Sequence, residues 1–189
     1  MTADQVLEVF RRCGALLHGH FILRSGLHSR TFFQCALVLQ DPVATSELCG
    51  ALVEKVKVDK WVFHSVISPA MGGILVGHEV ARHLGRRHIF AEKVEGQLRI
   101  RRFDIKPGER FLVVEDVITT GSAVREVIQR VKEAGGEVAG VVCLVNRSET
   151  KPELGVPMCS LLSLPVETFS ASSIPEDLQK IPAVKPGSR

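Results

Sequence analysis

The chain has 189 residues, of which 45% are hydrophobic and 24% are charged, and its formal net charge at pH 7 is +3. This length suits one domain with a sizeable core, and the composition is ordinary for a globular protein. The small net charge gives no reason to expect a nucleic-acid partner, and no apolar run approaches the roughly 18 residues that a membrane helix needs. We therefore expect a single domain over residues 1–189 that binds neither nucleic acid nor a membrane.

The cysteines bear on the cellular compartment. There are five of them, an odd number, with no CxxC pair, and most stand among apolar neighbours. Reduced, packed thiols of this kind are typical of a cytosolic protein rather than of a disulfide scaffold or a zinc site. The first residues carry acidic and basic side chains at helical spacing, which is unlike a signal peptide. We therefore expect a cytoplasmic protein.

Residues 1–40 combine a helix with short strands. Thr2 and Gln5 have the spacing of a capping box, and apolar residues follow at helical intervals, which predicts a helix from about residue 3 to 17. Residues 20–39 contain aromatic and branched side chains around a Ser-Gly pair, which predicts two strands joined by a turn. Asp41-Pro42 then predicts the start of a second helix, with Asp as the N-cap and Pro as the first helical residue.

From residue 61 onward, strands and helices alternate. The predicted strands are Trp61–Ile67, His88–Ala91, Arg110–Val114, Val138–Val145 and Met158–Leu164, and the predicted helices are Ile74–Leu84, Ala123–Ala134 and a short one near Pro175–Lys180. Residues 93–103 are polar and basic, and predict a hairpin or a mobile loop. Near-continuous apolar strands that alternate with helices favour an α/β fold, in which helices cover both faces of a parallel sheet.

The carboxyl edge of this sheet is the expected place for a ligand. Three predicted loops lie there: Ser68–Gly73, Lys93–Arg102 and Asp116–Ser122. The third loop belongs to the string FLVVEDVITTGSAV, in which an apolar strand runs into two acids, a turn rich in hydroxyls and a helix. Backbone N–H groups and hydroxyls at a helix N-terminus bind anions, and the acids can accept hydrogen bonds from sugar hydroxyls. The string therefore predicts a site for a phosphorylated sugar, with an ordinary capped βα turn as the alternative.

The complete string resembles the phosphoribosyl-pyrophosphate (PRPP) signature of type I phosphoribosyltransferases, which is four apolar residues, an acidic pair, two apolar or small residues and then T-T-G-S-A. The resemblance implies that fold, with a core over about residues 41–165 and a small hood formed by residues 1–40 and the C-terminal tail. It also implies that Glu115 and Asp116 hold the ribose hydroxyls. Their charge would stabilise the positive charge that builds on the ribose in the transition state.

The same resemblance assigns the donor site. The residues expected to bind PRPP are Arg24, Ala70, Gly72, Gly73, Lys93, Arg99, Glu115, Asp116, Val117, Ile118, Thr119, Thr120, Gly121, Ser122 and Ala123. Lys93, Glu115 and Asp116 are the expected catalytic residues. In the family, the loop of Lys93 is flexible and reaches into the neighbouring subunit's active site; a solvated basic hairpin is the alternative. The chain departs from the family pattern in two places, because Gly72 stands where many orotate enzymes have a Lys, and the loop lacks a His.

The N-terminal region indicates which base is the acceptor. Phe21–Gly26 followed by Phe32-Phe33 resembles the hood of orotate phosphoribosyltransferases, in which the aromatic pair lines the base pocket. Arg147 matches the family's orotate-binding Arg, and a guanidinium suits the carboxylate of orotate. The residues expected to bind orotate are Phe32, Phe33, Thr119 and Arg147. For the aromatic pair, a strand with one core residue and one edge residue remains the alternative.

The sequence is thus identified as resembling the orotate phosphoribosyltransferases, which join orotate to PRPP in pyrimidine nucleotide synthesis. The resemblance implies Mg²⁺ that rides on PRPP with few direct protein ligands, and a homodimer. Two alternatives stay open. A purine phosphoribosyltransferase would keep the donor turn and change the hood, and a non-catalytic regulator of the same fold would bind PRPP without turnover.

Overall fold

The computed structural model describes residues 1–23, 25–58, 61–148, 150, 152–165 and 167–186. Its helices are α1 (Ala3–Arg12), α2 (Cys35–Leu39), α3 (Pro42–Val58), α4 (Gly72–Leu84), α5 (Ser122–Glu133) and α6 (Glu176–Gln179). Its strands are β1 (Leu16–Ile22), β2 (His28–Phe33), β3 (Ser65–Pro69), β4 (Arg87–Val94), β5 (Gln97–Arg99), β6 (Arg110–Ile118), β7 (Glu137–Asn146), β8 (Met158–Ser163) and β9 (Thr168–Phe169). Within this part of the chain, no helix combines the length and apolarity needed to cross a bilayer.

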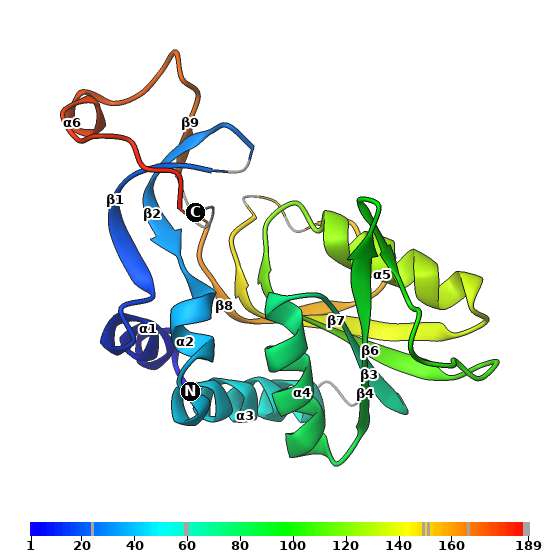
Figure 1. Ribbon diagram of the computed structural model, residues 1–189. Helices are drawn as coiled ribbons and strands as arrows, with labels where there is room; N and C mark the ends of the chain where they lie inside the picture. The colour runs from blue at the N-terminus through cyan, green and yellow to red at the C-terminus, as the bar shows by residue number, and fades with distance from the viewer. Residues whose placement is uncertain (24, 59–60, 149, 151, 166, 187–189) are drawn as a thin grey trace.

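The strands form two sheets (Figure 1). The larger sheet has six strands in the order β5-β4-β3-β6-β7-β8, and all its neighbours are parallel except the edge pair β4–β5. The smaller sheet, β1-β2-β9, is antiparallel and stands apart from the larger one. This confirms the predicted α/β fold, with a mostly parallel sheet and a small hood.

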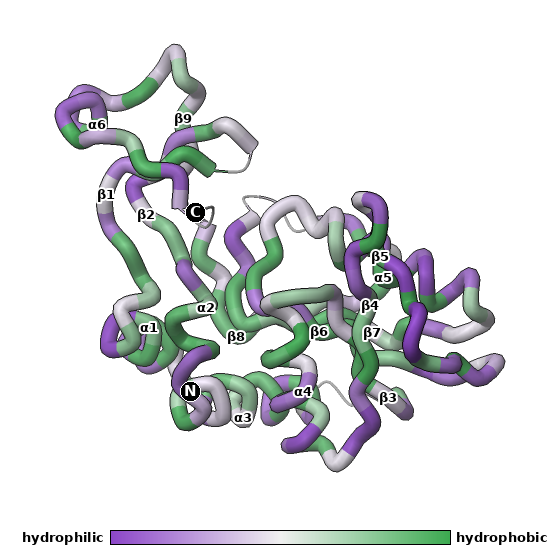
Figure 2. The backbone as a smooth tube through the Cα atoms, viewed as in Figure 1, coloured by the Kyte–Doolittle hydropathy of each residue, from purple (hydrophilic) through white to green (hydrophobic). Residues whose placement is uncertain are grey.

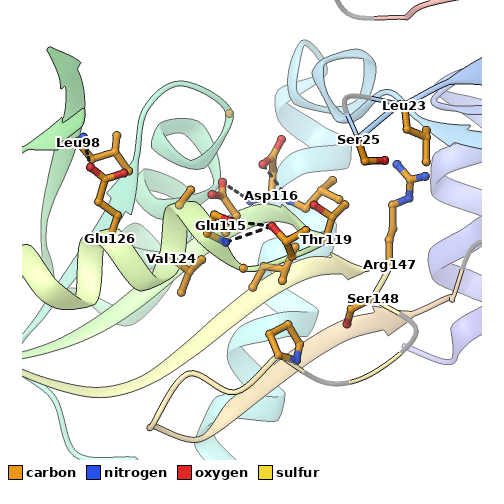
Figure 3. Close-up of a pocket in the computed structure, with 18 of the residues that line it drawn as sticks. Leu23, Ser25, Leu98, Glu115, Asp116, Thr119, Val124, Glu126, Arg147 and Ser148 are labelled. Atoms are coloured by element: carbon orange, nitrogen blue, oxygen red, sulfur yellow. Dashed lines mark hydrogen bonds between the residues drawn. The ribbon is translucent and has the colours of Figure 1, made fainter. Parts of the chain in front are cut away.

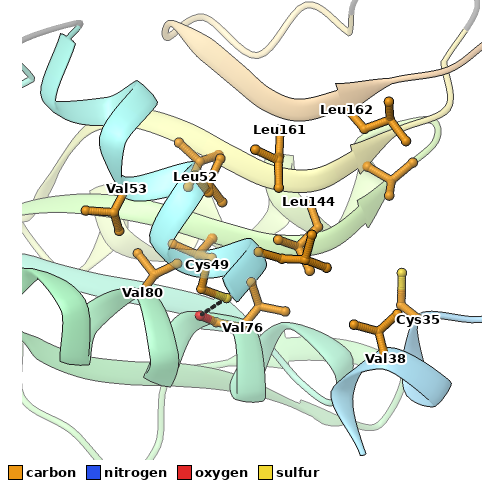
Figure 4. Close-up of a cluster of buried hydrophobic side chains, with 14 of the residues drawn as sticks. Cys35, Val38, Cys49, Leu52, Val53, Val76, Val80, Leu144, Leu161 and Leu162 are labelled. Atoms are coloured by element: carbon orange, nitrogen blue, oxygen red, sulfur yellow. Dashed lines mark hydrogen bonds between the residues drawn. The ribbon is translucent and has the colours of Figure 1, made fainter. Parts of the chain in front are cut away.

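Helices cover both faces of the larger sheet, and each face has its own core. On one face, α1, α2, α3 and α4 pack against alternate residues of the strands, and buried aliphatic side chains fill the space between them (Figure 4). On the other face, α5 buries a stripe of valines and isoleucine against the intervening residues. Both faces are therefore apolar, which is why the strands read as near-continuous hydrophobic runs. In Figure 2 hydrophobic colour runs through these strands, whereas the β4–β5 hairpin is mostly hydrophilic.

The first helix is shorter than predicted. Its capping box is present, because Gln5 N–H donates to Thr2 Oγ1 and Thr2 N–H donates to Gln5 Oε1. It ends at Arg12 rather than near residue 17, because the chain closes a Schellman motif: Gly14 N–H bonds to Arg11 O, and Ala15 N–H bonds to Phe10 O. The apolar residues after Gly14 continue the helical spacing by coincidence, and they belong to β1.

The prediction of strand structure up to residue 39 was wrong in its last part. The Ser-Gly turn and the two strands are present, but Cys35–Leu39 forms the helix α2 instead of extending β2. A short apolar run such as CALVL fits a buried strand and a buried helical turn equally well, so periodicity alone does not decide between them. The predicted strand Trp61–Ile67 begins later, at Ser65, and the remaining core elements agree with prediction to within a few residues.

The C-terminal tail packs on the hood. Thr168–Phe169 adds a third strand to the small sheet, and Val184 exchanges backbone hydrogen bonds with His20 and Ile22 of β1. The predicted short helix is present as α6. The tail therefore packs on the small sheet from the far end of the chain.

Candidate active site at the carboxyl edge of the larger sheet

A cavity of about 1050 Å³ opens where the carboxyl ends of β6 and β7 face the hood. In Figure 3 it extends from Leu98 and Glu126 at one end, past Glu115, Asp116 and Thr119, to Arg147 and Ser25 at the other. The residues that line it are Leu23, Ser25, Leu27, Phe32, Ala70, Gly72, Lys93, Gly96, Leu98, Glu115, Asp116, Val117, Ile118, Thr119, Thr120, Gly121, Ser122, Ala123, Val124, Glu126, Arg147, Ser148, Thr150, Pro152 and Thr168. Residues 115–124 of the predicted signature therefore line the middle of this cavity.

The acid pair lies at the middle of the cavity. Glu115 is only 8% exposed, and its Oε1 accepts the backbone N–H of Asp116 at 3.1 Å. Burial, and after it the charge of Asp116, raises the pKa of Glu115 well above its ordinary value. Asp116 is more open, and its Oδ1 accepts the N–H of Val117 at 2.8 Å. The pair thus combines a carboxyl group that resists ionisation in the empty cavity with a more exposed carboxylate.

The first residues of α4, directly after the loop that follows β3, pack on the acid pair. A Cβ atom at Gly72 would stand 2.4 Å from Asp116 Oδ2, and one at Gly73 would stand 2.9 Å from Glu115 Oε1. Any side chain at Gly72 would therefore displace the Asp116 carboxylate or the loop itself. This gives a physical reason why the chain has glycine at the position where the resemblance expected a lysine, since in this arrangement the acid occupies the space.

The turn between β6 and α5 presents hydroxyls and backbone N–H groups to the cavity. Gly121 has a φ of +74°, in the left-handed region, which glycine enters at low cost. Thr120 Oγ1 and Ser122 Oγ lie 2.8 Å apart, and Arg125 donates to the carbonyl of Thr120. The N-terminus of α5 begins directly after this turn, so its free N–H groups and positive dipole end face the cavity. This arrangement suits a phosphate group.

Arg147 lies at the opposite end of the cavity, on the loop after β7. Its backbone N–H donates to Ile118 O, which joins it to the end of β6. The residue is 9% exposed, and its buried Nε has no hydrogen-bond partner in the part of the chain that the structure describes. The guanidinium carbon lies 5.6 Å from the centre of the Phe32 ring. Burial lowers the pKa of Arg147 from its ordinary value, and no ion pair to it occurs among the described residues.

The two adjacent phenylalanines have different surroundings. Phe32 lines the cavity under Arg147, whereas Phe33 is 3% exposed and its ring meets Phe10 edge-on at 5.3 Å. Successive side chains of a strand point to opposite faces, so the cavity can hold only one of the pair. The expectation that Phe33 also lines the base pocket is corrected accordingly, and Phe33 belongs to the core.

The basic segment forms the hairpin of β4 and β5, one of the two arrangements predicted for it. Lys93 is exposed and lines the cavity of its own chain. Arg99 does not line the cavity, because it follows Leu98 on β5 and points to the other face. Arg102 donates to both oxygens of Glu92. Arg24 lies outside the described residues, and its donor contact stays a prediction, as does that of Arg99.

Several residues of the cavity wall were missed by sequence reasoning. Ser25 and Leu27 flank the predicted hood turn, so the resemblance could have pointed to them. Leu98 and Glu126 carry no motif, and neither do Ser148 and Pro152. They reach the cavity because β5, α5 and the loop after β7 meet there in space. No local sequence pattern predicts this meeting.

Comparisons with known proteins agree with this arrangement. Residues 45–171 match the family model described as "Phosphoribosyl transferase domain". An orotate phosphoribosyltransferase of Pelotomaculum thermopropionicum is 51% identical over all of this chain and 99% of its own length. One from Desulforamulus reducens is 50% identical over all of this chain and 98% of its own length.

A solved structure has a similar fold. The crystal structure of orotate phosphoribosyltransferase from Aeropyrum pernix superposes with a TM-score of 0.72 at 26% sequence identity. The match covers 84% of this chain and 93% of that one. The similarity therefore includes most of both chains.

Proposed function

The chain belongs to the orotate phosphoribosyltransferase family, and we propose that its cavity performs the reaction which that name describes. A phosphoribosyl group passes from PRPP to orotate, and the products are orotidine 5′-phosphate and pyrophosphate. The enzyme is then a glycosyltransferase that moves a pentosyl group, in the de novo synthesis of UMP. The proposal rests on two relatives that are 50% and 51% identical to this chain over its full length. It also rests on the chemistry of the two ends of the cavity.

The observation that carries the choice of orotate is the buried side chain of Arg147, whose Nε has no hydrogen-bond partner among the described residues. Arg147 is 9% exposed and its buried Nε lacks a partner among the described residues, and burying such a cation costs free energy. An anionic ligand would offset this cost, and a carboxylate can accept two parallel hydrogen bonds from a guanidinium. Orotate carries such a carboxylate. Adenine, hypoxanthine and uracil do not, so they would leave Arg147 unpaired.

The donor end supports ribosyl transfer. In the transition state positive charge builds on the ribose, and fixed carboxylates beside it lower the barrier. Asp116 provides this charge directly. Glu115 resists ionisation in the empty cavity, and a positive ribose beside it would favour its charged form. The Thr119–Ala123 turn holds the 5′-phosphate, so the sugar is fixed at both ends while the bond to pyrophosphate breaks.

Mg²⁺ is proposed as the cofactor. The pyrophosphate oxygens of PRPP are ligands of the kind that Mg²⁺ prefers, so the ion would ride on the donor with few direct protein ligands. The bound ion would neutralise charge on the leaving pyrophosphate. The side chains of this chain would hold the ribose and the phosphate in either case, and they would orient the donor toward the base. Removal of divalent cations with EDTA should abolish turnover, and added Mg²⁺ should restore it.

A homodimer is also proposed. Met71 and Leu75 are one helical turn apart at the start of α4, and they are 83% and 52% exposed. Exposed apolar side chains beside a cavity are typical of a surface that a second subunit covers. Light scattering should give the mass of two chains, and Leu75→Glu should shift it toward one. Val43→Glu, at an exposed valine on α3, is the control. A single-chain mass for the parent protein would refute the dimer.

A cytoplasmic location is proposed from the thiols. All five cysteines are thiols rather than disulfides, and Cys35, Cys49 and Cys143 are buried. Burial raises the pKa of Cys49 to about 12, so this thiol stays protonated and inert. Such cysteines fit a reducing compartment.

The decisive experiment measures the loss of orotate absorbance with purified protein, Mg²⁺ and PRPP, with adenine, hypoxanthine and uracil in parallel. Turnover of orotate alone is the expected result. Turnover of a purine instead would keep the donor site and refute the assignment of the base. Binding of PRPP with no turnover on any base would favour a regulatory protein of the same fold.

A further inference from the structure

The guanidinium of Arg30 joins β2 to the C-terminal tail. It donates to both carboxylate oxygens of Asp177, and the bond to Oδ1 measures 3.0 Å. Its Nε lies 3.5 Å from Glu167 Oε2, and its central carbon lies 5.4 Å from the centre of the Phe169 ring. A planar guanidinium is suited to both kinds of contact, because it can hold a carboxylate by two parallel bonds and lie over an aromatic ring. One side chain of β2 therefore holds the tail at three points between residues 167 and 177.

Backbone contacts hold the same part of the tail more weakly. Ser29 stands opposite Thr168 in the antiparallel pair of β2 and β9, and Ser29 Oγ donates to Glu167 O at 3.1 Å. However, β9 has only two residues, and a strand of that length gains little stability from its ladder alone. We therefore expect the side-chain contacts of Arg30 to decide how firmly β9 stays on β2.

The segment that leads into β9 is also tied to the larger sheet, beside Arg147. The end of β8 pairs with the end of β7, and Leu164 N–H donates to Asn146 O at 2.9 Å. Asn146 directly precedes Arg147 in the chain. Residues 164–165 and 167–169, which we call the strap, are therefore held next to Arg147 at one end and on β2 at the other.

The strap connects the two walls of the base end of the cavity. Phe32 and Arg147 form these walls, and the Arg147 guanidinium carbon lies 5.6 Å from the centre of the Phe32 ring. Thr168 of the strap lines the cavity together with both of them, whereas Arg30 does not line it. Arg30 and Phe32 are two positions apart on β2, so their side chains point to the same face of the strand. Arg30 can thus influence the base end only through the strap and the strand that it joins.

We propose that Arg30 is a positioning residue for base binding, which clamps the strap on β2 and so holds Phe32 at a fixed spacing from Arg147. The small sheet stands apart from the larger one, so this spacing depends on the segments that connect the two sheets (Figure 1). Loss of the clamp lets the walls separate, which weakens the binding of the base and leaves the donor turn unchanged. This inference rests on the proposed function, because it takes orotate as the base between the walls.

The first test compares the two substrates. Arg30→Ala removes the clamp, and the KM for orotate should rise by about 5-fold to 10-fold, as when charge-assisted hydrogen bonds are lost. The KM for PRPP should stay within about twofold, because residues 115–123 form the donor turn without help from the strap. Arg30→Lys keeps the charge but loses the planar fork, so it should give an intermediate KM for orotate.

Arg11→Ala is the matched control for this test. Arg11 is an exposed arginine of α1 that lies 3.5 Å from Glu8, and its removal should leave both KM values unchanged. An unchanged KM for orotate in Arg30→Ala would overturn the proposal. An equal rise in the KM values of both substrates would overturn it as well, because that result indicates a general loss of structure.

The second test asks whether Arg30 acts through the tail. Asp177→Ala should raise the KM for orotate by a smaller factor than Arg30→Ala does, because Glu167 and Phe169 still contact the guanidinium. In an Arg30→Ala background it should cause little further rise, since its partner is already absent. Glu176→Ala, at the neighbouring exposed acid of α6, is the control. Rises that multiply in the double variant would contradict the role of the tail.

The third test measures the clamp without substrate. Hydrogen exchange followed by mass spectrometry reports local opening of a segment. Peptides that cover residues 167–181 should exchange faster in Arg30→Ala than in Arg11→Ala, whereas peptides of β6 and α5 should exchange equally in both. Equal exchange of the tail in the two variants would refute the clamp, whatever the activity of the parent protein.

The exchange measurement also distinguishes failure of this proposal from failure of the proposed function. If the tail opens as expected in Arg30→Ala but the parent protein turns over no orotate, the proposed function fails while the clamp stands. If the parent turns over orotate and the tail opens, but the KM for orotate does not rise, the positioning role fails while the proposed function stands.

Discussion

The donor end and the base end of the cavity are constructed in different ways. At the donor end, one continuous segment of chain supplies the acid pair, the phosphate turn and the N-terminus of α5. At the base end, Arg147 comes from the loop after β7, Phe32 from β2 and Ser25 from the hood turn. A continuous segment keeps its geometry through local hydrogen bonds. The base end depends on how the hood sits over the larger sheet. Specificity can therefore change at the base end while the donor end stays constant.

The largest expected effect concerns the donor end. Asp116→Asn removes the more exposed carboxylate and keeps its shape, so kcat should fall by about 10²-fold to 10³-fold, as when a preorganised charge is lost from a transition state. Steady-state kinetics with orotate measure this loss. The affinity for orotate should be nearly unchanged if the two ends of the cavity act independently. Weaker orotate binding in this variant would show that the two ends are coupled.

The next effect concerns the base end. Arg147→Ala should raise the KM for orotate by about 30-fold or more, because the carboxylate loses a buried, charged partner. Affinity for PRPP should change little, since Arg147 lies away from the phosphate turn. Isothermal titration with each substrate separates the two affinities. An unchanged KM for orotate would refute the assignment of Arg147.

The adjacent phenylalanines sharpen the distinction between cavity and core. Phe32→Leu should raise the KM for orotate by about 3-fold to 10-fold, since an aromatic contact is worth about 0.5–1.5 kcal/mol. Phe33→Leu should instead lower the free energy of unfolding by about 1 kcal/mol and leave the KM unchanged. Urea unfolding and kinetics on both variants measure the two effects. A KM effect from Phe33→Leu would place that residue back in the base pocket.

The smallest expected effect is a pH-dependent stability difference at Glu115. The pKa of this group is raised in the folded protein, so its burial favours folding at low pH and that contribution is lost as the pH rises above about 4.5, the ordinary value. Glu115→Gln cannot ionise, so its Tm should exceed that of the parent by a few degrees near pH 8. The difference should shrink toward pH 4.5. Melting curves across this range test the prediction, with Glu54→Gln as an exposed control whose Tm difference should not vary.

Much of the site could be predicted from the sequence, because the residues of its donor half follow one another along the chain. The string from Phe111 to Val124 contains the strand, the acids, the turn and the helix start in order, so its local chemistry predicted the start of the helix to within one residue. The strand was predicted to end at Val114, but β6 continues through both acids to Ile118. The base half was predicted only through the resemblance of the hood. Even there, sequence reasoning assigned both Phe32 and Phe33 to the base pocket. Strand alternation says that they point to opposite faces, but not which face meets the cavity.

By itself the sequence determined the fold class, the position of the phosphate turn and the pairing of acids with hydroxyls, because these follow from periodicity, capping and turn chemistry within short stretches. Only the tertiary structure decided the remaining features. It placed Phe33 in the core, buried the Arg147 Nε without a hydrogen-bond partner among the described residues, and set Gly72 against Asp116. It also brought Glu126 to the peptide of Leu98. Some of these features depend on contacts between residues that are distant along the chain, and others depend on which side of a helix or strand faces inward. Both are fixed only when the complete molecule packs together.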